Sequence, residues 1–193
     1  MARLRVVTDV EIARAARKVF LEHGTQAPVA WVARELGVSS ATVFTRMGTK
    51  RRLITAALWP PDPPILAVLE QGFDHGEPIE RQLRRIVAAL AHYADAEIPA
   101  TFTLYAAGLR AKPGEDFSDV TPTRLRRAMT KWLRQAVEHD QTISDPRTVA
   151  ELVLGTLEAR AMHAFLGKRK VPERETRAFV RSLVATVLFP LRR

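Results

Sequence analysis

Polar and cationic side chains recur at helical spacing near residue 40, and their chemistry suits contacts to a polyanion. In the segment VAWVARELGVSSATVFTRMGTK, which covers residues 29 to 50, the outward positions of the second half are Thr42, Thr45 and Arg46. A DNA major groove admits one helix, hydroxyls and small methyl groups approach base edges there, and Arg and Lys bind phosphate or guanine. The spacing therefore predicts a helix that reads double-stranded DNA.

Two short helices joined by a tight turn would position these side chains. Gly37 falls where a left-handed residue ends the first helix, and Ser39 can cap the second, Ser40 to Met47. Val43 and Met47 would face inward. The segment is thus predicted to be a helix-turn-helix.

Composition and charge narrow the class of protein. Residues 1–59 contain ten Lys and Arg against four Asp and Glu, so they carry six of the net +9 charges of the 193-residue chain. A basic excess on the reading motif is typical of DNA binding. The absence of cysteine excludes disulfides and thiolate metal sites. With no secretory signal and no apolar run of about 18 residues, we expect a cytoplasmic protein that does not enter a membrane.

Proline and glycine mark the limits of the remaining helices. Thr8 and Glu11 have capping-box spacing at the start of a first helix that ends at Gly24, and Pro28 suits the first position of the second helix. After a short helix from Lys50 to Trp59, the prolines of residues 60–64 end helical structure. We predict a DNA-binding domain over residues 1–59 and a second domain over residues 60–193.

The second domain is also predicted to be helical, which makes the fold all-α. Helices are expected over 65–73, from Pro78 to about residue 96, from Pro99 to Leu109, from Thr121 to about residue 138, from Asp145 to about residue 167, and from Pro172 to about residue 189.

The last two of these helices have apolar residues on more than one face. A helix on the outside of a monomer needs one apolar stripe, so a second stripe indicates a homodimer contact; the alternative is that both helices are central in the protomer. The residues predicted for the contact are Leu152, Thr156, Phe179, Leu183 and Val187.

With these features assembled, the chain resembles the TetR family of bacterial transcriptional regulators. The resemblance rests on an amphipathic first helix, then ELGVSSATVF, a short interruption and TKRRLITAAL, all within residues 8–58. It implies an N-terminal three-helix DNA-binding domain and a C-terminal helical domain for ligand binding and dimerisation. It also implies a cytoplasmic homodimeric repressor, released from a palindromic operator by a small, mainly apolar effector. The DNA-binding residues are then Ser39, Ser40, Thr42, Phe44, Thr45, Arg46 and Lys50.

The sequence departs from the family pattern at two of these positions. Phe44 stands where the family commonly has a tyrosine that reaches a phosphate, so Phe44 can only pack. Arg46 stands at a frequent histidine position, where it would recover the lost phosphate contact, and Lys50 would cap the backbone-contacting edge of the next helix. Arg3 and Arg5 form either an arm in the minor groove or a solvated tail.

An effector pocket would be lined by apolar and aromatic side chains with a few polar groups. Our candidates are Phe102, Tyr105, Met129, Trp132, Glu158, Met162 and His163, although each taken singly also suits an ordinary core. No cofactor or metal is expected. Two alternatives remain: a DNA-binding regulator without a small-molecule ligand, and a helical enzyme using His92, Glu158 and His163, whose spacing does not match a helical metal pair.

Overall fold

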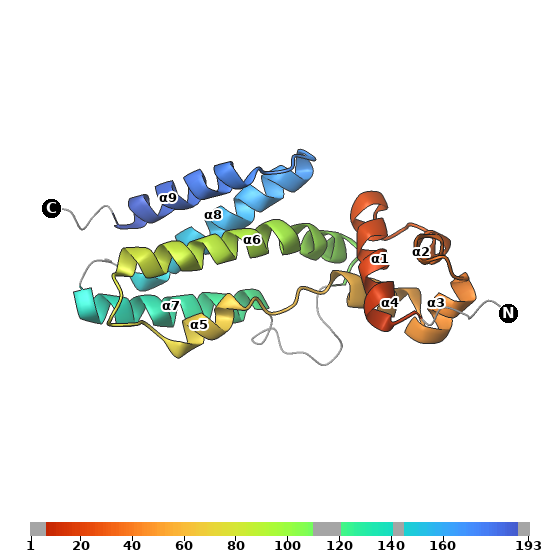
Figure 1. Ribbon diagram of the computed structural model, residues 1–193, viewed down its shortest axis with the longest axis horizontal. Coiled ribbons are helices and arrows are strands. Elements are labelled where there is room, and N and C mark those ends of the chain that lie inside the picture. The colour runs from red at the N-terminus through yellow and green to blue at the C-terminus, as the bar shows by residue number, and fades with distance from the viewer. Residues whose placement is uncertain (1–6, 110–120, 141–144, 189–193) are drawn as a thin grey trace. The chain divides into compact units, whose positions relative to one another are not determined.

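The computed structural model describes residues 7–109, 121–140 and 145–188, and every regular element in these ranges is a helix (Figure 1). The chain forms two compact units. The first comprises Met1–Pro60 and Pro99–Gly114, and the second comprises Pro61–Ile98 and Glu115–Arg193. The all-α prediction is confirmed. Arg3 and Arg5 lie outside the described residues.

Four helices make up most of the first unit: α1 (Asp9–His23), α2 (Val29–Leu36), α3 (Ser40–Met47) and α4 (Lys50–Leu58). The predicted capping box of α1 is present, since Thr8 Oγ1 accepts from the Glu11 amide at 3.2 Å and Glu11 Oε2 accepts from the Thr8 amide at 2.8 Å. The amphipathic character expected of this helix is confirmed, because its apolar residues are buried: Ile12, Ala16, Val19 and Phe20. Pro28 is the N-cap of α2 and not its first helical residue.

The helix predicted to open at Pro99 does not exist as a separate element. Pro99 lies inside a single helix, α6 (Ile79–Ala106). A proline within a helix removes one backbone hydrogen bond and costs about 3 kcal/mol. The residues that follow it offset this cost, because Ala100 and Leu104 are almost fully buried in the core of the first unit. Of the described residues, 99–109, which the sequence places in the second domain, thus group with the first unit.

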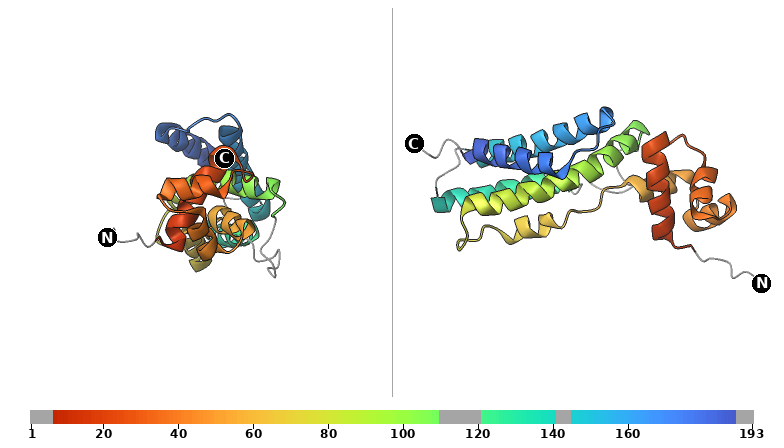
Figure 2. Two further views of the ribbon diagram at one scale, coloured as in Figure 1. Left: turned by 90° about the vertical axis from the view of Figure 1, so that its right-hand side faces the viewer. Right: turned by 45° about the horizontal axis from the view of Figure 1, so that its top comes forward.

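The second unit contains α5 (Ile65–Gln71), most of α6, α7 (Thr121–Asp140), α8 (Pro146–Leu166) and α9 (Glu173–Leu188). α7 packs along α8 and against α5, and the turned views of Figure 2 show the long helices side by side. Their shared core is centred on fully buried side chains such as Trp132, Leu133 and Leu157. None of the described helices is both long and apolar enough to cross a membrane.

A partly buried ionic cluster joins three helices of the second unit. Arg160 on α8 donates to both carboxylate oxygens of Asp95 on α6, at 2.9 and 3.0 Å, and to Thr176 Oγ1 on α9 at 2.5 Å. Its guanidinium also lies over the Phe179 ring, 5.1 Å from the centroid. Removing one partner of such a cluster would leave a partly buried charge unpaired, so the cluster fixes α8 against α6 and α9.

Candidate nucleic-acid interface

The turn that orients α3 has the geometry predicted from Gly37. This residue is left-handed, with φ 68° and ψ 32°. The Val38 amide donates to the Ala33 carbonyl at 3.0 Å and the Gly37 amide donates to the Arg34 carbonyl at 3.1 Å. These two bonds satisfy carbonyls that the end of α2 leaves free, and they turn the chain sharply into α3.

Hydrogen bonds close both ends of the short α3 helix. Ser39 Oγ accepts from the Thr42 amide at 3.1 Å, which confirms the predicted cap. At the other end the Gly48 amide donates to the Phe44 carbonyl at 2.8 Å. Val43 and Met47 are buried in the core of the first unit, as predicted. The eight residues of α3 therefore have a fixed inner face and a fixed outer face.

The outer face of α3 presents small and apolar groups. Ala41, Phe44 and Thr45 are exposed, and Phe44 has 42% of its surface accessible. Thr45 Oγ1 donates back along the helix to the Ala41 carbonyl at 2.9 Å. The predicted reading residues thus occupy one helix and its cap, with Ser40 and Thr42 partly buried at its edge.

Arg46 has a partner that the sequence did not predict. Its Nε donates to Asp9 Oδ1 on α1 at 2.7 Å, and both side chains are exposed. An exposed ion pair of this kind contributes about 0.2–1 kcal/mol, so a phosphate group can compete for the guanidinium. In the free chain Arg46 braces α3 against α1.

Lys50 connects two elements and does not act as a cap. Its Nζ donates to the Gln26 carbonyl, between α1 and α2, at 3.1 Å. The cap of α4 is Thr49, whose Oγ1 accepts from the Arg52 amide at 3.1 Å. The predicted cap is therefore wrong by one residue, whereas the start of α4 at Lys50 is as predicted and the contact of Lys50 with DNA stays a prediction.

The first unit has further cations that were not predicted from the sequence to contact DNA. Among the described residues, four exposed arginines have no carboxylate within ion-pair distance: Arg14, Arg34, Arg51 and Arg52. In addition, α2, α3 and α4 have no acidic residue in their first turns. The partial positive charge of a helix N-terminus therefore adds to these guanidinium groups, a combination that attracts phosphate. These arginines are recognised as candidates for phosphate contact by their exposure in the structure, which helical periodicity alone does not reveal.

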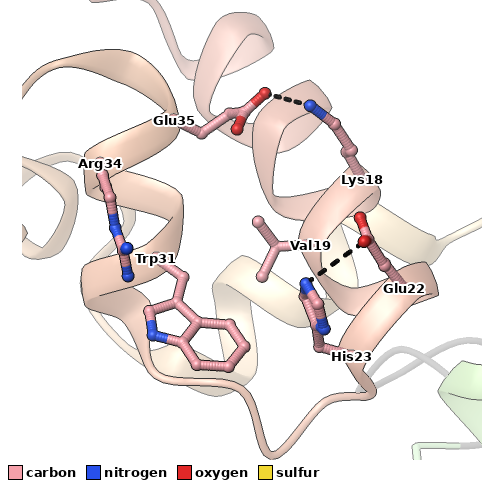
Figure 3. A pocket seen from close by; sticks show the side chains of 7 residues that line it. All are labelled: Lys18, Val19, Glu22, His23, Trp31, Arg34 and Glu35. Carbon is pink, nitrogen blue, oxygen red and sulfur yellow. Dashed lines mark hydrogen bonds and ion pairs between the residues drawn. The ribbon is translucent and has the colours of Figure 1, made fainter.

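A shallow groove of about 360 Å³ lies between α1 and α2 (Figure 3). The Trp31 indole forms one wall, with the His23 ring edge-on to it at 4.8 Å. Across the groove Lys18 pairs with Glu35, and this bond raises the pKa of the lysine. The groove's two cations and two carboxylates balance, so it adds no net charge to the unit. The ion pair and the ring contact hold α1 and α2 together.

The seven candidate effector residues do not form one group. Met129 and Trp132 are buried in the core of the second unit, whereas Phe102 and Tyr105 are exposed on the part of α6 that belongs to the first. On α8, Glu158 and Met162 are partly buried and His163 is exposed. Burial raises the pKa of the Glu158 carboxyl. The groove between α1 and α2 contains none of the seven in its lining.

The five candidate dimer residues also divide by burial. Leu183 and Val187 are buried in the core of the protomer itself. Phe179 and Thr156 are partly buried, and Leu152 has 48% of its surface exposed. Small residues are also exposed on these two helices, at Gly155, Ala159, Ala178, Ser182 and Ala185, beside charged ones such as Arg177 and Arg181.

Comparison of the chain with protein-family models and with the sequences of curated proteins gives no match. Solved structures do match it over nearly the whole chain. The fatty acid degradation regulator FadR from Bacillus halodurans is 17% identical with a TM-score of 0.68, and the match covers 98% of this chain and 99% of that one.

Two other solved structures agree with this match. The TetR family transcriptional regulator PfmR from Thermus thermophilus is 22% identical with a TM-score of 0.68, covering 94% of this chain and 99% of that one. A TetR transcriptional regulator from Streptomyces coelicolor is 23% identical with a TM-score of 0.54, covering 96% and 98%. The chain therefore has the fold of TetR-family regulators, which confirms the resemblance at the level of fold.

Proposed function

We propose that this chain, with its TetR fold, is a DNA-binding transcriptional regulator that places α3 in the major groove. The observation that carries the proposal is the construction of α3. The helix follows the left-handed Gly37, has bonded caps at both ends, buries Val43 and Met47, and exposes Ala41, Phe44 and Thr45. An exposed helix on a fixed turn is what reading base edges requires.

Electrostatics support the same proposal. The unpaired arginines and the acid-free starts of α2, α3 and α4 provide phosphate contacts on the first unit. Phosphate contacts fix the register of a protein on the duplex, and each one adds to the salt dependence of binding. No catalytic step forms part of the proposal.

The experiment is selection of genomic DNA fragments by the purified protein at two salt concentrations, followed by footprinting of the selected fragments. We expect a palindromic footprint whose two half-sites lie about one helical turn apart, with affinity falling steeply as salt rises. Binding without sequence preference at either salt concentration would contradict the proposal.

The proposal includes a homodimer formed through α8 and α9. Leu152 and the small exposed residues of α8 and α9 would allow the helices of two protomers to approach closely, while Leu183 and Val187 support the face from inside. Gly155 offers a clean test, because a Cβ added there meets no atom within 4 Å in the protomer. Gly155→Glu should therefore give a folded monomer in sedimentation, because it puts a charge on the contact.

The matched variant is Leu183→Glu, which puts the same charge into the protomer core. It should reduce thermal stability as well as dimer content, since Leu183 is only 7% exposed within one chain. A Gly155→Glu protein that remains dimeric would contradict this interface.

Repression released by a small, mainly apolar effector completes the proposal. Glu158, half-buried one turn from Met162, would supply the polar anchor; burial raises the pKa of its carboxyl, and the charge of Arg126 opposes that rise. An effector releases DNA only if it binds the released conformation better. The second candidate, a regulator with no such ligand, is favoured by the close packing of Met129 and Trp132 in the core. Loss of operator binding on adding a compound would decide between them.

A further inference from the structure

The outer face of α3 offers an incoming DNA duplex apolar groups at three neighbouring positions. Ala41 and Thr45 are one turn apart, and Phe44 lies three residues after Ala41, so the three side chains share one side of the helix. All three are exposed, and Phe44 is 42% accessible, so it is one of the large apolar residues that the first unit leaves exposed. The accessible part of this side chain is available to an apolar partner.

The threonine hydroxyls of α3 form hydrogen bonds within the protein. Thr45 Oγ1 donates to the Ala41 carbonyl at 2.9 Å. Thr42 Oγ1 and Ser39 Oγ bond to each other at 2.9 Å, and Ser39 Oγ also accepts from the Thr42 amide. Because the Thr45 hydrogen is used in this way, its methyl group is available to an apolar partner.

The major groove contains one kind of apolar group in unmodified DNA. Thymine carries a C5-methyl there, whereas the other base edges present hydrogen-bond donors and acceptors. A phenyl ring set against polar edges would remove them from water without satisfying them, which is unfavourable. Set against a methyl group, the same ring gains the free energy of apolar burial.

We infer that Ala41, Phe44 and Thr45 form an apolar reading surface that selects thymine C5-methyl groups in each operator half-site. This inference rests on the proposed function and specifies what α3 reads. Phe44 is the specificity-determining residue, because its ring is the largest exposed apolar group of the helix. The phosphate contacts then come from the arginines and not from position 44.

The test uses the operator found by footprinting, with each thymine replaced singly by uracil, a change that removes only the C5-methyl group. We expect one or two thymines per half-site at which the affinity falls about fourfold, the factor that corresponds to one buried methyl-sized group. In Phe44→Ala the affinity for the thymine operator should fall, and the effect of uracil at those positions should disappear. Phe44→Leu should keep part of the effect.

Trp31→Ala is the matched control. Trp31 is another exposed aromatic residue of the first unit, 38% accessible, but it belongs to α2. Its variant should keep the full uracil effect, and circular dichroism should show that both alanine variants fold.

Three negative results have different meanings. Specific operator binding that is insensitive to uracil at every position overturns the inference and leaves the proposed function intact. Absence of any sequence-specific binding overturns the proposed function and the inference with it. A uracil effect that persists unchanged in Phe44→Ala also overturns the assignment to this residue.

Discussion

α3 and α8 both present an outward face, but different kinds of contact hold them in place. α3 has eight residues, two of them buried, and depends on Gly37, Ser39 and the pair of Arg46 with Asp9. α8 has 21 residues, six of them buried, and the Arg160 cluster joins it to two other helices. The orientation of α3 thus depends on a few local bonds, whereas that of α8 depends on a distributed core.

The largest effect should come from the core of the second unit. Trp132 is 1% exposed and packs edge-on against Phe73. Trp132→Ala should lower the free energy of unfolding by about 3–5 kcal/mol, through lost burial and the cavity left behind. Chemical denaturation measures this loss in the free energy of unfolding. A loss below about 1 kcal/mol would instead indicate a side chain that lines an open effector pocket.

Two glycines sharpen the contrast between the units. Gly37→Ala should destabilise the first unit by about 1–2 kcal/mol, because an alanine resists the left-handed conformation. Gly155→Ala should stabilise the protomer by up to about 1 kcal/mol when measured at concentrations at which the chain is monomeric, because Gly155 lies within α8 and its added Cβ meets open space within one chain. Thermal denaturation of both variants checks the signs. If the two substitutions changed the free energy of unfolding equally, the turn would not depend on Gly37.

Substitutions in the ion pair of Arg46 and Asp9 should change DNA affinity by a smaller amount, and the sign of each change can be predicted. Asp9→Asn should raise DNA affinity several-fold, since it frees Arg46 and removes a negative charge from the first unit, while Arg46→Ala should lower affinity and reduce the salt slope by about one. Binding titrations over a range of salt concentrations measure both. If Arg46→Ala left the affinity and slope unchanged, Arg46 would be a brace for α3 and nothing more.

The smallest effect should be the pH dependence contributed by Glu158. Burial raises the pKa of this carboxyl, so the folded state keeps the proton to a higher pH than the unfolded state does. Its charge therefore costs stability above the folded pKa, and this cost disappears below the unfolded pKa. Glu158→Gln should stabilise the protein at pH 7 and have no effect in acid, as denaturant midpoints would show. A destabilised variant at pH 7 would point to a favourable ionic partner for Glu158.

The same contrast explains which predictions from sequence were accurate. The limits of α3, the cap at Ser39, the turn at Gly37 and the capping box at Thr8 all depend on residues within about four positions of each other. Such spacing is readable in a single sequence. The continuity of α6 through Pro99 was not readable, since it depends on the tertiary burial of Ala100 and Leu104.

Contacts between distant segments were missed for the same reason. The bond from Arg46 to Asp9 spans 37 residues and the bond from Arg160 to Asp95 spans 65. The effector candidates were chosen by residue type, which does not determine where a residue lies. Met129 is buried in the core of the second unit, whereas Tyr105 belongs to the first unit. A short motif specifies its own geometry, whereas a pocket is specified only by the packing of several helices.

The placement of α3 in the major groove can be measured directly because the chain contains no cysteine. A single cysteine introduced by Ala41→Cys would carry a tethered iron chelate that cleaves nearby DNA, with Lys131→Cys at an exposed position of α7 as the matched control. We predict cleavage confined to each operator half-site from position 41 and no such cleavage from position 131. Cleavage from position 41 that is absent or spread evenly along the duplex would contradict the central claim that α3 reads DNA.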